Sequence, residues 1–158
     1  AGSYAVTVDV DDAVGNDATQ VTATVIIDTT VPANDGVISI NDAAPLTNTT
    51  AVNIKVTTAP TEANTRYKVG FSETNDSATV ATWNNYVFNT NIPFTLSTGD
   101  GVKTVYAFFK DKAGNVSTAG VSDTITLDTD APALFTGVAA DGGAPGLDTG
   151  DTLALTFD

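Results

Sequence analysis

The side chains in this sequence that are best suited to chemistry are carboxylates and amides, which gather in short polar segments between alternating apolar runs. They fall at turns, loops and joints between predicted strands, at Asp12, Asp28, Glu62, Asp111, Asn115, Asp128 and Asp130. Carboxylate and amide oxygens are the ligands that Ca²⁺ prefers in proteins. If these loops meet at the ends of the domains, the sequence predicts calcium sites that stiffen the joints.

A second interpretation of the same residues needs no metal. Asp and Asn are common in turns because their side chains accept hydrogen bonds from nearby backbone N–H groups. We favour this interpretation, and the D-x-[DN]-x-[DN]-G pattern of an EF-hand is absent. The Gly-rich stretch that contains Asp141, Asp148 and Asp151 has the same two interpretations, and for it a flexible acidic loop is favoured.

The second candidate site is aromatic. Trp83, Tyr86 and Phe88 form a cluster whose ring faces could bind the apolar face of a sugar. Large aromatic side chains are more often packed in the core or along a sheet edge. We favour packing, and we keep a carbohydrate- or protein-binding module as the alternative function.

The composition excludes several classes of function. The chain has no His and no Cys, so Ser-His-Asp catalysis, imidazole or thiolate zinc sites and disulfides are ruled out. Six Lys and Arg against 19 Asp and Glu give a net charge of -13, which argues against binding nucleic acid or an anionic membrane. No apolar run approaches the length of a membrane span. Because no pair of carboxylates is placed for hydrolysis, we expect a non-enzymatic protein.

Apolar residues alternate with polar ones along most of the chain. Val6, Val8 and Val10 alternate with Thr and Asp, and Val52, Ile54 and Val56 do the same later. A period of two predicts half-buried strands, and Thr and Val suit strands because they branch at Cβ. No segment has helical spacing. About seven such runs separated by turns predict an all-β, Ig-like antiparallel β-sandwich.

The strongest pattern is an internal repeat of roughly one hundred residues. The segment from Gly2 to Asn16 matches that from Gly101 to Asn115, and after a slip of one residue Val21 to Pro32 matches Val121 to Pro132. We therefore expect residues 1–30 to be the last two strands of one repeat, residues 33–132 to be a complete repeat, and residues 133–158 to be the first strands of a third.

The run STGDGVKTVYAFFKDKAGNVS, followed by DTITLDTDAP, resembles the bacterial Ig-like tandem repeats of large cell-surface and secreted proteins. Adhesins and surface-layer-associated proteins contain such repeats. The resemblance implies a spacer module outside the cell, with neighbouring repeats of the same chain as its partners. Sequons for N-glycosylation begin at Asn48, Asn75 and Asn115.

The two incomplete ends predict exposed apolar faces and open strand edges. Two explanations fit. The chain is a window on a longer tandem array, or separate copies complete one another by strand addition and form a filament or surface layer. We favour the array, because the repeat spacing already explains both ends.

Overall fold

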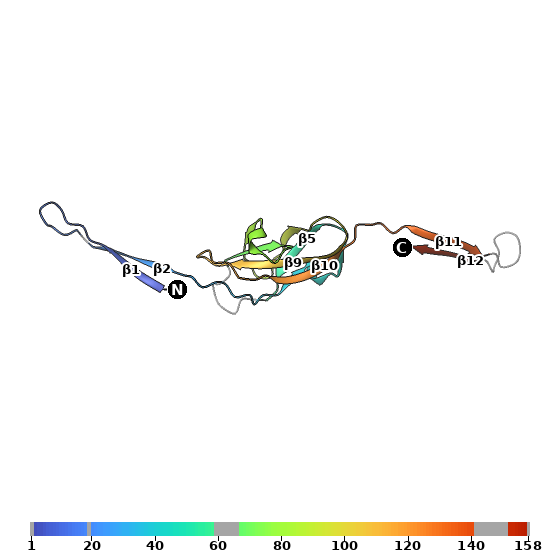
Figure 1. The fold of residues 1–158 in the computed structure, drawn as a ribbon, viewed down its shortest axis with the longest axis horizontal. Helices are drawn as coiled ribbons and strands as arrows, with labels where there is room; N and C mark the ends of the chain where they lie inside the picture. Colours follow the sequence, from blue (N-terminus) through green and yellow to red (C-terminus); the bar gives the residue numbers. More distant parts are fainter. Residues whose placement is uncertain (1, 19, 59–66, 141–151, 158) are drawn as a thin grey trace.

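The computed structural model describes residues 2–18, 20–58, 67–140 and 152–157. These residues form three parts in a row: an N-terminal hairpin, a central unit over residues 33–132, and a C-terminal hairpin (Figure 1). The described chain is all-β, as predicted, with only two single turns of 3-10 type, η1 at Asn41–Ala43 and η2 at Ser77–Thr79. The strands are β1 (Gly2–Val8), β2 (Val21–Ile27), β3 (Ile38–Ile40), β4 (Leu46–Thr47), β5 (Ala51–Val56), β6 (Lys68–Ser72), β7 (Trp83–Asn85), β8 (Ile92–Thr95), β9 (Gly101–Lys110), β10 (Val121–Leu127), β11 (Leu134–Ala140) and β12 (Thr152–Phe157).

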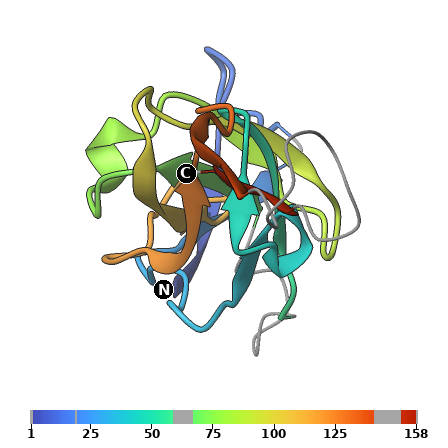
Figure 2. The same ribbon diagram turned by 90° about the vertical axis from the view of Figure 1, so that its right-hand side faces the viewer.

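The central unit has two sheets that share one hydrophobic core. One sheet has the order β4-β10-β9-β6-β7 and the other the order β3-β5-β8. Side chains from both sheets meet in the core, which comprises Ile38, Ile40, Val52, Ile54, Val56, Val69, Phe71, Ile92, Leu96, Val105, Ala107, Phe109 and Ile125. Figure 2 views this unit along the long axis of the molecule, with the C-terminal hairpin in front.

The alternation in the sequence is reproduced in the burial of the strands. In β5, Val52, Ile54 and Val56 are buried, whereas Ala51 and Asn53 are exposed and Lys55 is partly exposed. The side-chain period of a strand is two, so one face of β5 joins the core and the other faces water. In β9, both Phe108 and Phe109 are buried. Phe109 belongs to the core, and the Phe108 ring lies close to Gly120, where an added Cβ would be 3.1 Å from Phe108 Cζ.

The first part of the central unit contributes to both sheets. β3 pairs antiparallel with β5, and β4 pairs with β10 in parallel, with Leu46 opposite Thr126 and Thr47 opposite Leu127. Every other strand pair in the described residues is antiparallel. The sandwich is therefore antiparallel except for one short pair of strands. β4 could not be predicted from the sequence, because a two-residue strand after Pro45 carries no periodic pattern.

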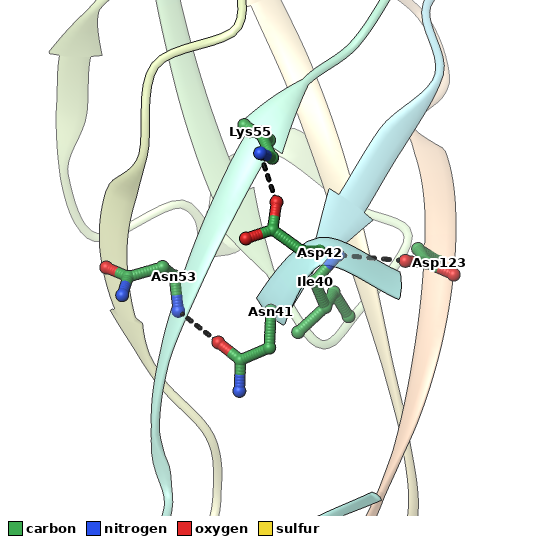
Figure 3. A network of polar contacts seen from close by, with 6 residues as sticks. All are labelled: Ile40, Asn41, Asp42, Asn53, Lys55 and Asp123. Atoms are coloured by element: carbon green, nitrogen blue, oxygen red, sulfur yellow. Dashed lines mark hydrogen bonds and ion pairs between the residues drawn. The ribbon is translucent and has the colours of Figure 1, made fainter. Parts of the chain in front are cut away.

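Between β3 and β4 the chain passes from one sheet to the other through a turn with left-handed backbone conformations. Asn41, Asp42 and Ala43 have φ values of 46°, 61° and 65°. The turn is held by side chains that reach β5: Asn41 Oδ1 accepts from the backbone N–H of Asn53 at 2.8 Å, and Asp42 forms an ion pair with Lys55 (Figure 3).

The N-terminal hairpin repeats the pairing of β9 with β10. In β1 and β2, Gly2 lies opposite Ile27 and Val8 opposite Val21. The equivalent pairs in the central unit are Gly101 with Leu127 and Ala107 with Val121. The one-residue slip in the sequence repeat is therefore present in the structure, and the two hairpins have the same register.

The repeated hairpins differ in their surroundings. Val105 and Ile125 are 0% and 1% exposed, but their equivalents Val6 and Val25 are 48% and 47% exposed. In the described residues, β1 and β2 form a sheet of only two strands. Such a hairpin is marginal in water without a layer against its apolar face, and in the central unit β3, β5 and β8 supply that layer.

Candidate functional site

The polar residues singled out in the sequence form two copies of one turn, which we call the N-terminal Gly-Asn turn (residues 12–16) and the central Gly-Asn turn (residues 111–115). In the first, the N–H of Asp12 donates to the carbonyl of Asn16 at 3.0 Å, and Asn16 Nδ2 donates to Asp12 Oδ2 at 2.8 Å. In the second, Asp111 and Asn115 make the same two bonds at 3.1 and 2.9 Å. The sequence repeat is thus also a repeat of hydrogen bonds.

Glycine allows each turn to close. Gly15 and Gly114 have φ values of 82° and 97°, in the left-handed region that other residues rarely adopt. The backbone N–H groups that follow then point back at the aspartate. Asp111 Oδ1 accepts from Gly114 and Asn115 at 2.7 and 2.9 Å, so both of its carboxylate oxygens have donors.

The two aspartates differ in exposure. Asp111 is only 6% exposed, in the wall of the central unit. Asp12 is exposed at the tip of the β1–β2 hairpin. Hydrogen bonds from Asn16, first from its backbone and then from its side chain, together with that from Val14, lower the pKa of the Asp12 carboxyl below its ordinary value of 3.8.

The joints repeat as well. We call residues 28–32 the N-terminal joint and residues 128–132 the C-terminal joint. Asp28 Oδ1 accepts from the N–H of Thr30 at 3.0 Å, and Asp128 Oδ1 accepts from that of Asp130 at 3.2 Å. In both joints, the aspartate carboxylate accepts a hydrogen bond from the backbone N–H of the residue two positions later.

The structure places the predicted metal ligands in three separate groups. The central Gly-Asn turn meets the N-terminal joint, where Asn115 Nδ2 donates to the carbonyl oxygen of Asp28 at 3.0 Å. Asp12 lies in the turn between β1 and β2, and Asp128 and Asp130 lie between β10 and β11, at the other end of the central unit (Figure 1). Glu62, Asp141, Asp148 and Asp151 lie outside the described residues. Within the described ranges, no three acidic, His or Cys side chains lie close enough together to hold a metal ion.

The aromatic cluster is spread over different environments. The Lys110 ammonium lies 4.1 Å from the centre of the Trp83 ring, over its face. Tyr86 packs edge-on against Phe109, with 6.1 Å between ring centres, and borders the core. Phe88 is about half exposed. The partly exposed Trp83 ring therefore has a cation on one face, and Tyr86 is engaged in packing.

Trp83 also lies close to a glycine of β6. A Cβ on Gly70 would lie 3.2 Å from Trp83 Cε3 and 2.3 Å from Val80 Cγ1. Beside these residues is an open groove between the edge strands of the two sheets, lined by Phe71, Ala81, Thr82, Asn84, Pro93, Phe94 and Thr95. Its polar groups are few and its walls include no charged side chain.

The sequence did not predict two features of the joints, the difference in burial between the two prolines and the contact between Asp100 and Thr129. Pro32 is buried, whereas its repeat equivalent Pro132 is exposed. Asp100 accepts from the N–H and the hydroxyl of Thr129 at 3.0 and 2.8 Å. Spacing alone does not reveal such contacts, because each depends on where a neighbouring segment enters the unit.

Comparison of the chain with protein-family models and with curated proteins finds no match. Among the described residues, no helix has the length and apolar character needed to cross a bilayer.

Proposed function

We propose that this chain is a segment of an extracellular surface protein, in which residues 33–132 form one Ig-like repeat of a non-enzymatic spacer array. Such an array would form part of an adhesin stalk, a surface layer or a filament. The observation that carries the proposal is the hairpin β1–β2, which repeats the register and the turn hydrogen bonds of β9–β10.

The strand order supports an Ig-like topology for the central unit. Its N-terminal part divides between the two sheets, with β3 beside β5 and β4 beside β10. The last two strands, β9 and β10, pair antiparallel, and the segment that joins them contains the central Gly-Asn turn. This is a two-layer arrangement of the kind found in Ig-like sandwiches.

The exposed faces of the hairpins support the array. β1 and β2 expose Tyr4, Val6, Val8 and Val25, and in the central unit the equivalent face is covered by the first strands of the same repeat. β11 pairs antiparallel with β12, as β3 does with β5. In the array, β1–β2 belongs to the repeat before residues 33–132 and β11–β12 to the repeat after them. These two neighbouring repeats are the partners of the central unit.

The sequence offers a direct test, because Ala33 follows Pro32 and Pro132 ends the repeat. A chain in which a second copy of residues 33–132 follows Pro132 recreates the junction between Pro32 and Ala33. We expect both copies to fold, with small-angle X-ray scattering showing an extended rod and hydrogen exchange showing equal protection of the two cores. A second copy that stays unprotected, or two copies that pack side by side, would contradict the array.

The alternative function is a binding module that uses the aromatic cluster. It is favoured only by the partial exposure of Trp83, since Tyr86 borders the core. Binding to a glycan array that is lost in Trp83→Ala, while the variant keeps its melting temperature, would favour the module over the spacer.

A further inference from the structure

We infer that the central Gly-Asn turn is a docking site for the joint that enters the unit, with the side-chain amide of Asn115 as the recognition group and the backbone carbonyl of Asp28 as its ligand. The same contact would then recur at every joint of the array. This inference rests on the proposed function and adds the means by which neighbouring repeats are held at a defined angle.

The first support is the way in which the amide is used. A side-chain amide has two N–H hydrogens. One hydrogen of Asn115 goes to Asp111 Oδ2 at 2.9 Å, and the other goes to the carbonyl of Asp28 at 3.0 Å. Asp111 is nearly buried and is itself held by turn N–H groups. The amide is therefore fixed in position before the joint arrives, so little side-chain freedom is lost on docking.

The second support is the comparison between the two turns. Asn16 makes the same bond to its aspartate as Asn115 does. Within the described residues, however, Asn16 Nδ2 donates to Asp12 Oδ2 alone, and no joint lies against this turn. The N-terminal end thus carries an unfilled donor.

The third support is the comparison between the two joints. The N-terminal joint enters a complete unit, and there Pro32 is buried. The C-terminal joint leads into the C-terminal hairpin, and there Pro132 is exposed and lines an open hollow with Asp128, Asp130 and Ala131. Among the residues that the structure describes, no donor lies on the carbonyl of Asp128, which is the equivalent of the Asp28 carbonyl that Asn115 binds.

The C-terminal joint is already anchored to the unit that it leaves. The N–H of Asp128 donates to the carbonyl of Thr47 at 2.9 Å, and Thr129 is bound by Asp100. A joint that is hydrogen-bonded to the unit before it in the chain, and also to the unit after it, has little freedom to bend. Because donor and acceptor lie at opposite ends, the contact is head-to-tail and does not close, which suits a long stiff array.

The test measures how firmly the β1–β2 hairpin is held against the central unit in the full chain. The chain has no Cys, so Thr22→Cys and Asn91→Cys, both at exposed positions, allow a pair of spin labels to be attached, one on each part. Pulsed electron paramagnetic resonance then gives the distribution of distances between them. We expect a narrow distribution in the parent and a clearly broader one in Asn115→Ala.

The matched control is Asn16→Ala, which removes the same bond to an aspartate but touches no joint. We expect it to leave the distribution as narrow as in the parent. Equal widths in the parent and Asn115→Ala, or equal broadening by both variants, would overturn the docking site. Either result leaves the array untouched, since the array is tested by the tandem copy of residues 33–132.

A second measurement needs no variant and so does not depend on Asn115→Ala being folded. In the isotope-labelled full chain, which carries no spin label, NMR should detect a scalar coupling between Asn115 Nδ2 and the carbonyl carbon of Asp28, transmitted across their hydrogen bond. The amide hydrogen in that bond should exchange slowly. The corresponding hydrogen of Asn16 should exchange rapidly. Absence of the coupling, with fast exchange at Asn115, would also overturn the inference.

Discussion

The carboxylate of Asp123 accepts a hydrogen bond from the backbone N–H of Ile40, with 2.9 Å between Oδ2 and the nitrogen (Figure 3). Asp123 is the one charged residue on the core-facing side of β10, where the alternation would place an apolar side chain. Ile40 is the last residue of β3, and its side chain is completely buried. The aspartate therefore satisfies a backbone donor at the place where the chain leaves one sheet for the other.

The first prediction concerns this bond. Asp123→Ala leaves a buried donor without a partner, which typically costs about 1–3 kcal/mol. We expect the free energy of unfolding in urea to fall by that amount, and by less in Asp123→Asn, which keeps an acceptor. Asp130→Ala, at an exposed position, is the control and should change stability by no more than about 0.5 kcal/mol. Equal effects of Asp123→Ala and Asp130→Ala would contradict the role given to Asp123.

The second prediction concerns the left-handed turn after β3. Ala43 has φ of 65°, a region that costs an ordinary L-residue about 1–2 kcal/mol. Glycine is free of that cost but loses more freedom on folding, by roughly 0.5–1 kcal/mol. We expect Ala43→Gly to stabilise the protein by up to about 1.5 kcal/mol. Ala51→Gly, in the regular strand β5, should have the opposite sign, and a loss of stability in both variants would contradict the argument.

The third prediction concerns the packing under Trp83. A Cβ added at Gly70 would lie 2.3 Å from Val80 Cγ1, and overpacking of this kind costs roughly 1–3 kcal/mol. We expect Gly70→Ala to lower the unfolding free energy and Val80→Ala, made in the same chain, to restore much of the loss. A double variant as unstable as the sum of its two single variants would show that Val80 is not the obstacle.

The fourth prediction concerns pH. Because its hydrogen bonds lower the pKa of Asp12 below 3.8 in the folded hairpin, the charged carboxylate supports the N-terminal Gly-Asn turn above pH 3.8. That support is lost as the pH falls through the lowered pKa. A carbon-detected NMR titration should show Asp12 below its ordinary value and, in Asn16→Ala, closer to it. An Asp12 that titrates alike in the two chains would contradict this cause.

The fifth prediction concerns calcium. Asp12, Asp28, Asp111 and Asp128 each accept hydrogen bonds from the backbone of their own turn or joint, and within the described ranges no three acidic side chains gather closely enough to hold a cation. We therefore expect the same melting temperature in EDTA and in millimolar calcium. A cation that bound only the folded chain would stabilise it by about 2.7 kcal/mol at a hundredfold excess over the dissociation constant. A rise of that size in the melting experiment would restore the calcium site.

The sequence by itself determined the local structure. Alternation in the segment from Val52 to Val56 predicted a half-buried strand, and Gly114 with Asn115 predicted a tight turn, because both features depend only on a few neighbouring residues. The repeat also predicted that residues 1–30 correspond to the last strands of the central unit, and the equal register of β1–β2 and β9–β10 agrees with it. The bridges that close the two turns also correspond, Asp11 with Asp17 and Lys110 with Val116, so the one-residue difference between the hairpins falls after the turn and before the second strand.

The tertiary structure decided which of these polar groups meet. Asn115 and Asp28 are 87 residues apart, and Asp123 and Ile40 are 83 apart, so no local pattern relates either pair. The same holds for Lys110 over the ring of Trp83, which changes how the aromatic cluster is interpreted. Hydrogen bonds and ring contacts form only within a few ångströms. Their partners are therefore set by how the sheets pack and by where each joint enters its unit, which the alternation of apolar residues does not specify.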